Sequence, residues 1–157
     1  MEIIIRRTKI EEHNQVLELS LKTFMEFEAP VYSDEGAQTF KKDMIENDDF
    51  NNDCLSGKNR IWGAFIQEKL VGLFGMRGES HICLVFTDGK YHRKGIATEV
   101  FKKLLADVKI ETPDLKKITL NSSPYGLPFY HRIGFTEVEP EKTMNGIIYT
   151  PMVYEIL

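Results

Sequence analysis

The residues best suited to chemistry lie between His81 and Leu105, where an apolar run leads through a basic loop into a helical pattern. The apolar run is HICLVFT, and the loop is Lys90-Tyr91-His92-Arg93-Lys94, in a chain with a net charge of −4. Gly95 opens the helix. The first turn of a helix presents unpaired N–H groups and the positive end of the helix dipole. The segment therefore predicts a phosphate site.

Two familiar phosphate loops are absent from this segment. The Walker A sequence G-x-x-x-x-G-K-[ST] does not occur, and the dinucleotide fingerprint needs three glycines where Gly95 stands alone. Gly95 and Ala97 nevertheless leave room for a pyrophosphate to approach the backbone. Many helix N-termini bind nothing, so the residues alone leave a plain helix start as the alternative.

The elements around this segment would hold it near the centre of a sheet. Strands are predicted at 3–7, 61–66, 70–76, 81–87 and 117–121, with two more at about 135–138 and 147–156. Helices are predicted at about 9–27, after Ser33 as N-cap, from Gly95 onward, and from Ser122-Ser123-Pro124 to Gly134. Thr8 and Glu11 have the form of a capping box, and the polar stretch 47–59 is expected to be a loop. The order β-α-α-β-β-β-α-β-α-β-β predicts an α/β (α+β) fold, with strand 81–87 near the middle of a mixed sheet.

Length and composition predict one ordinary globular domain over residues 1–157, with 42% hydrophobic and 28% charged residues. No apolar run is long enough to span a membrane, and the N-terminal apolar stretch is too short for a signal peptide. A cytoplasmic location is therefore expected, with Cys54 and Cys83 as reduced thiols. The 20 Lys and Arg residues are scattered, which argues against nucleic acid as a partner.

Two motifs in this order resemble the GNAT superfamily of N-acetyltransferases. The run His92-Arg93-Lys94-Gly95-Ile96-Ala97 is similar to the family signature of Gln or Arg, two residues, Gly, one residue, then Gly or Ala, with His at the first position. Farther on, Phe129-Tyr130-His131-Arg132-Ile133-Gly134-Phe135 resembles the family's Tyr-x-x-x-Gly-Phe segment. The runs SHICLVFTDGKYHRKGIA, NSSPYGLPFY and NGIIYTPM are also similar to a recurrent group of uncharacterised bacterial members.

The resemblance implies a mostly antiparallel GNAT-like sheet and acetyl-CoA as co-substrate. It makes the backbone of Val85, Phe86 and Thr87 the edge that pairs with the pantetheine arm, with a bulge interrupting the strand there. An N–H near Val85 would face the thioester carbonyl. The pyrophosphate would be held by the backbone of His92, Arg93, Lys94, Gly95, Ile96, Ala97 and Thr98. Asn121 would bond the pantetheine amides, although Ser123 stands where many members have Asn.

Tyr130 is the residue that the resemblance assigns to the leaving thiolate. Its ordinary pKa of about 10 lies above the thiol's ~8.5, so full proton donation is uphill by about 2 kcal/mol. A hydrogen bond to the departing sulfur is therefore expected, or donation after the pKa of Tyr130 is lowered. The alternative is a core aromatic residue.

His81 is the candidate base, because it lies on strand 81–87 where some family members have a catalytic Glu. It is mostly neutral at pH 7 and can accept a proton directly or through water, and the alternative is a histidine that caps a strand end. Cys83 lies about 6.6 Å along the strand from it, which is too far for a Cys–His nucleophile pair. The four histidines have no zinc-binding spacing, so no metal is predicted.

The acceptor is expected to be a primary amine of a small molecule or peptide. Acidic residues between the first two helices, Glu26, Glu28 and Glu35, would attract a cationic amine, or they are solvated surface. The alternatives are a non-catalytic coenzyme A-binding sensor or interaction module of the same fold, and a phosphate-loop domain for another nucleotide. The sequence leaves open whether the chain acts alone or as a homodimer.

Overall fold

The computed structural model describes residues 2–157 as one eight-stranded sheet flanked by helices. The strand order is β1-β2-β3-β4-β5-β8-β6, with β7 paired to β8, and only the β4–β5 pair is parallel. The strands are β1 Ile4–Arg7, β2 Arg60–Ile66, β3 Lys69–Arg77, β4 His81–Thr87, β5 Lys117–Ser122, β6 Thr136–Glu137, β7 Lys142–Met144 and β8 Ile147–Glu155. The predicted mixed, mostly antiparallel sheet with β4 near its middle is confirmed.

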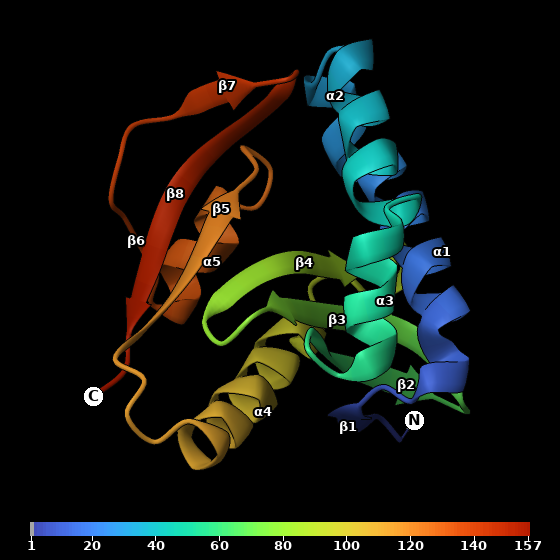
Figure 1. Cartoon of the computed structure of the whole chain (residues 1–157), viewed down its shortest axis with the longest axis vertical. Coiled ribbons are helices and arrows are strands. Elements are labelled where there is room, and N and C mark those ends of the chain that lie inside the picture. The colour runs from blue at the N-terminus through green and yellow to red at the C-terminus, as the bar shows by residue number, and fades with distance from the viewer. Residues whose placement is uncertain (1) are drawn as a thin grey trace.

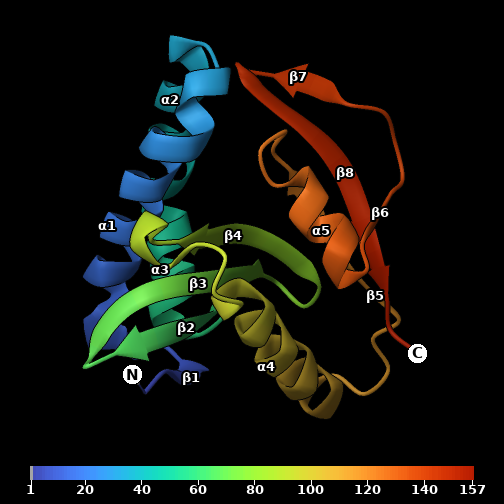
Figure 2. The ribbon, with the colours of Figure 1, turned by 180° about the vertical axis from the view of Figure 1, so that it is seen from behind.

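Helices cover both faces of the half of the sheet formed by β1–β4 (Figures 1 and 2). The helix α4, Ile96–Glu111, packs against β2 and β3 on one face, and α1, His13–Thr23, packs against β3 and β4 on the other. The remaining helices are α2 Asp34–Phe40, α3 Asp48–Ser56 and α5 Leu127–Ile133. This arrangement places the first turn of α4 beside the end of β4.

A bulge in β4 decides which of its side chains face which layer. The β3 partners shift register so that Gly75 opposes Leu84 and Met76 opposes Ile82, which leaves Cys83 as the extra residue. Ile82 therefore packs in the core cluster that contains α4, while Leu84 packs in the cluster that contains α1. The bulge was expected at Val85–Thr87 and lies earlier, because those three residues pair regularly with β3.

The two halves of the sheet separate beyond the start of β4. The parallel ladder joins only His81 to Thr119 and Ile82 to Leu120. From there β4 and β5 diverge, as Figure 1 shows. Among the described strands, residues 83–87 have no partner on the β5 side, so their backbone on that side can pair with something else.

The stretch 47–59, expected to be a loop, contains the helix α3. Asn47 caps its start by accepting a hydrogen bond from the backbone N–H of Phe50 at 2.8 Å, and the buried Phe50 ring anchors it. Gly57 ends it in the left-handed conformation. The prediction was wrong because this helix is anchored by one buried aromatic ring rather than by a full apolar face.

Two helix starts also differ from the prediction, while two helix boundaries agree. Near the N-terminus, the Glu12 carboxylate accepts from the backbone N–H of Lys9, so the cap lies one position after the expected Thr8 and Glu11 pair. The last helix begins at Leu127, because Ser123 first forms a turn with Gly126. Ser33 as N-cap and Gly134 as C-cap are confirmed. None of the helices within residues 2–157 is long and apolar enough to cross a membrane.

Candidate active site

A cavity of about 560 Å³ lies at the start of α4, between the end of β4 and α5. Gly95 occupies the N-cap position with φ +75° and offers no side-chain cap, so the first N–H groups of α4 remain available to an anion. Arg93, also with positive φ, and Arg132 from α5 add positive charge to the wall. We call this space the donor cavity.

The loop that leads into α4 is held by its own side chains. The Asp88 carboxylate accepts from the Lys90 N–H at 3.0 Å and pairs with Lys22 at 3.4 Å. The His92 Nε2 donates to the carbonyl of Thr87 at 2.7 Å, which ties the loop back to the end of β4. These bonds fix the backbone where phosphate is expected to bind.

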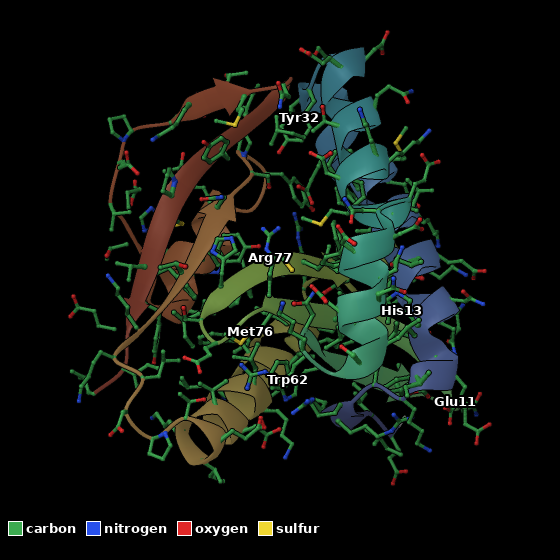
Figure 3. The ribbon with its side chains drawn as sticks, in the orientation of Figure 1. Glu11, His13, Tyr32, Trp62, Met76 and Arg77 are labelled. Atoms are coloured by element: carbon green, nitrogen blue, oxygen red, sulfur yellow. The ribbon has the colours of Figure 1, made fainter. Side chains whose placement is uncertain are left out.

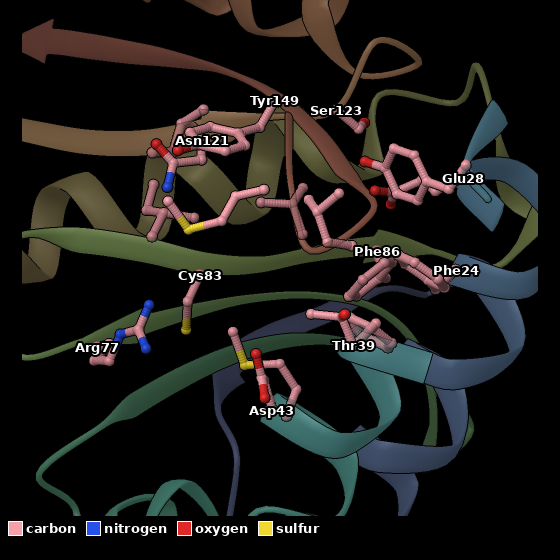
Figure 4. A pocket seen from close by; sticks show the side chains of 18 of the residues that line it. Phe24, Glu28, Thr39, Asp43, Arg77, Cys83, Phe86, Asn121, Ser123 and Tyr149 are labelled. Atoms are coloured by element: carbon pink, nitrogen blue, oxygen red, sulfur yellow. The ribbon is translucent and has the colours of Figure 1, made fainter. Parts of the chain in front are cut away.

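A second cavity of about 380 Å³ opens between the helical segment 24–44 and strands β4, β5 and β8 (Figure 4). The hairpin of β7 and β8 meets α2 at one side of it, since Thr39 Oγ1 donates to the carbonyl of Asn145 at 2.6 Å. The Tyr32 hydroxyl also donates to the carbonyl of Ile148 at 3.1 Å. We call this space the acceptor cavity.

The two cavities meet at a shared wall. Five residues line both of them: Glu28, Val85, Phe86, Ser123 and Tyr130. They come from the segment after α1, from β4, from the end of β5 and from α5. A ligand in each cavity would thus have its reacting end at the same place, which is the arrangement that direct transfer between two bound molecules needs.

Glu28 owes its position at this junction to an irregular turn. After α1 the chain makes a π-helical turn, Phe24–Glu28, and a 3-10 turn, Ala29–Val31, that contains Pro30 and after which the backbone becomes extended at Tyr32. Half-buried in the wall, the carboxyl loses hydration, which raises its pKa to about 7 against a smaller lowering by the Ser123 hydroxyl. A carboxyl group that titrates near neutral pH can accept a proton from a reacting amine.

Tyr130 is buried against Phe129 and Phe135, with ring centroids 5.5 and 5.9 Å away. Burial and the nearby Glu28 raise the pKa of the phenol well above its ordinary value, so it stays protonated at neutral pH. Within residues 2–157 its hydroxyl forms no hydrogen bond to protein, although the residue lines both cavities. A protonated hydroxyl without a protein partner can donate to a bound ligand.

His81 lies in the acceptor cavity but not in the donor cavity. Its Nδ1 is 2.9 Å from the Thr119 hydroxyl, and burial together with the charge of Arg77 lowers its pKa. Cys83, at the bulge, points its thiol at the carbonyl of Gly75, and burial raises the pKa of that thiol to about 12. The thiol therefore stays protonated at neutral pH.

The structure brings together most, but not all, of the residues that the sequence singled out. The donor cavity is lined by Val85, Phe86, Thr87, His92, Arg93, Gly95, Ile96, Ala97 and Thr98. Lys94 lines neither cavity, and Asn121 lines the acceptor cavity instead. Of the acidic residues, Glu28 lines both cavities, whereas Glu26 and Glu35 are exposed and line neither.

Three charged residues that line the cavities were not predicted from the sequence. Arg77 and Asp43 line the acceptor cavity, and Arg132 lines the donor cavity. Arg77 lies just beyond the strand predicted at 70–76 and precedes a glycine, so the local sequence does not assign it to a site. Only the pairing of β3 with β4 sets it opposite His81.

Within residues 2–157, no three His, Cys, Asp or Glu side chains are grouped so that they could hold a metal ion.

Comparison with known proteins decides the family. Residues 28–156 match the profile of the acetyltransferase (GNAT) domain, which covers most of the chain. The chain belongs to the GNAT acetyltransferase family. The resemblance seen in the sequence is thereby confirmed.

Relatives of this GNAT domain agree with its fold. An uncharacterised N-acetyltransferase of Escherichia coli K12, YafP, is 33% identical over 85 residues, which are 54% of this chain and 51% of that protein. The matched region thus spans about half the length of that curated relative. A GCN5-related N-acetyltransferase of Rhodopseudomonas palustris superposes with a TM-score of 0.83 at 17% identity, over 99% of this chain and 97% of the other. The PaiA N-acetyltransferase of Thermoplasma acidophilum, solved with coenzyme A, gives 0.79 at 18% identity, over 99% and 100%.

Proposed function

We propose that this GNAT domain moves the acetyl group of acetyl-CoA to a primary amine of a small molecule or peptide, by direct attack in a ternary complex. The observation that carries the proposal is the wall shared by the two cavities, formed by Glu28, Val85, Phe86, Ser123 and Tyr130. Acetyl-CoA occupies the donor cavity with its pyrophosphate at the start of α4. Its pantetheine arm pairs with the free side of Val85–Thr87.

The amine reaches the thioester from the acceptor cavity. Its nitrogen forms a bond to the carbonyl carbon, a backbone N–H near Val85 stabilises the oxyanion, and the C–S bond then breaks. Tyr130 donates a hydrogen bond to the departing sulfur, which is supported by its protonated hydroxyl without a protein partner. The products are the N-acetylated amine and coenzyme A.

Two residues are proposed as acceptors of the amine proton, and geometry favours Glu28. It lines both cavities and has a pKa of about 7, so transfer from an ammonium of pKa ~10.4 is uphill by about 3 units. His81, the base expected from the sequence, lines the acceptor cavity alone, and its lowered pKa makes the same transfer uphill by more than about 4 units.

The test is thiol release from acetyl-CoA with polyamines, amino sugars, amino acids and peptides as acceptors. We expect turnover with at least one class of amine, and the acetylated product is identified by mass. Binding of acetyl-CoA without turnover on any acceptor would instead support the non-catalytic coenzyme A sensor. Equal competition by ATP would point to another nucleotide.

A further inference from the structure

The six arginines of the chain divide into two groups by their partners. Three are paired with carboxylates: Arg6 with Glu12 at 2.8 Å, and Arg7 and Arg60 with Glu111 at 3.0 and 3.1 Å. The other three are Arg77, Arg93 and Arg132, and none has a carboxylate within 4.0 Å among residues 2–157. All three line a cavity. The arginines that lack a carboxylate partner are therefore those that line the two cavities, where they are exposed to solvent.

In the donor cavity, the proposed ligand supplies the missing anion, because Arg93 and Arg132 lie where the phosphates of coenzyme A are proposed to bind. Among residues 2–157, Arg77 is the one arginine or lysine that lines the acceptor cavity. An acceptor that carries a negative charge would complete the same pattern at Arg77.

The surroundings of Arg77 suit a small anion. It ends β3 opposite His81, and its charge acts on both His81 and Cys83. Figure 3 shows it at the end of β3 beside β4, and Figure 4 shows its guanidinium directed into the cavity. His81 is engaged through Nδ1 only, and Asn121 stands on the facing strand, so both can add hydrogen bonds.

Two acidic groups share the cavity, and neither neutralises Arg77. Glu28 lies at the opposite end, at the junction with the donor cavity (Figure 4). Asp43 stands on another wall and forms no ion pair with Arg77. The cavity therefore has a positive end at Arg77 and a reacting end at Glu28 and Tyr130.

We propose that the acceptor is an aminocarboxylate, whose carboxylate binds Arg77 while its amine lies at the junction with the donor cavity. This rests on the proposed acetyl transfer. A carboxylate fits better than a phosphate, because Arg77 supplies a single positive charge and its planar fork matches two carboxylate oxygens. The cavity volume of about 380 Å³ limits the acceptor to a small molecule or the end of a peptide.

The test compares matched pairs of amines with and without the carboxylate. The probes are 4-aminobutyrate, 6-aminohexanoate, L-lysine and L-leucine, each against its carboxamide, together with sulfonate and phosphonate analogues. In the unaltered chain we expect at least one acid to be used about 10- to 100-fold better than its amide. In Arg77→Gln we expect KM for that acid to rise by the same factor, with KM for its amide unchanged.

Arg77→Lys should recover part of the preference, because it restores the charge but not the fork. Lys109→Gln is the matched control, since it removes a positive charge from an exposed position that lines neither cavity. Equal use of acids and amides, or no change in Arg77→Gln, would overturn the proposal. Preference for a sulfonate or phosphonate would overturn the choice of carboxylate.

A binding measurement keeps this proposal separate from the proposed function. If no acceptor turns over, thermal stabilisation by the same acids is measured with coenzyme A bound. Stabilisation of the unaltered chain but not of Arg77→Gln would support the carboxylate site and count against catalysis. No difference between the two chains would overturn the carboxylate site as well.

Discussion

At the scale of single residues, the junction between the cavities combines an acid that stays protonated with a carboxyl group that titrates near neutral pH. Burial, and to a smaller extent the Glu28 carboxylate, raise the pKa of the Tyr130 phenol. The raised pKa of Tyr130 keeps its hydroxyl available as a hydrogen-bond donor. The pKa of Glu28 near 7 allows its carboxylate to accept a proton.

Tyr130→Phe tests the hydroxyl alone. The ring contacts with Phe129 and Phe135 persist, and the lost hydroxyl has no protein partner, so the melting temperature should change little. We expect kcat to fall about 10²- to 10⁴-fold with little change in acetyl-CoA affinity, because the hydrogen bond strengthens as charge develops on sulfur. Steady-state kinetics and acetyl-CoA titration measure both. Full activity would return Tyr130 to a packing role.

The pH–rate profile separates the two candidate bases. If Glu28 accepts the proton, the acidic limb should lie near pH 7 and disappear in Glu28→Gln, while His81→Ala keeps it. If His81 accepts it, the limb should lie below about 6.5, because its pKa is lowered, and should move in His81→Ala alone. A limb that neither variant moves would assign the role to water.

The Glu28→Gln variant should also change the pH dependence of the melting temperature. The pKa of Glu28 is raised from 4.5 to about 7 by folding, so the folded state binds the proton more tightly than the unfolded state does. The tighter proton binding stabilises the folded state fully below about pH 4.5, and this stabilisation is lost as the pH rises to about 7. Glu28→Gln should therefore raise the melting temperature at pH 8 more than at pH 4. An equal change at both pH values would contradict the raised pKa.

At the scale of elements, the start of α4 and the end of β4 line one cavity. The sixteen residues of α4 direct their dipole at the loop, and Gly95 opens the helix in a left-handed conformation with no neighbouring atom within 4 Å of an added Cβ. Space is therefore available at this position for a ligand, or for a substituted side chain.

Gly95→Glu should abolish acetyl-CoA binding, because it sets a negative charge where the pyrophosphate is proposed to lie. Gly95→Gln is the matched control, with the same size and the same cost of about 1–2 kcal/mol for the left-handed backbone. Titration calorimetry should show a much larger loss for Glu than for Gln. Equal losses would attribute the effect to backbone strain, and unchanged affinity in both would move the phosphate site elsewhere.

At the scale of the whole molecule, the parallel contact between β4 and β5 joins two halves of the sheet over only two residue pairs. The donor cavity is lined from both halves, by β4 and the start of α4 on one side and by α5 on the other. A ligand held between them should link the halves and stabilise the folded chain.

Acetyl-CoA at 100 times its dissociation constant should stabilise the chain by about 2.7 kcal/mol. For a domain of this size, that corresponds to a rise of about 5–11 °C in melting temperature. Differential scanning fluorimetry measures it, with ATP at the same concentration as the control. A melting temperature unmoved by millimolar acetyl-CoA would argue against the donor cavity.

The sequence by itself determined the elements whose signals are local. Strand 81–87, the helix that begins after Gly95, and the caps Ser33 and Gly134 were predicted because each depends on residues next to one another in the chain. The helix α3 was missed because a single buried ring, that of Phe50, replaces the expected apolar face.

Only the tertiary structure decided which charged residues line the two cavities. The π-helical turn sets Glu28 at the junction, while its neighbour Glu26 stays exposed. The pairing of β3 with β4 sets Arg77 beside His81, and the divergence of β5 turns Asn121 toward the acceptor cavity. These positions depend on contacts between segments far apart in the chain, and burial rather than residue type gives Glu28 its pKa near 7.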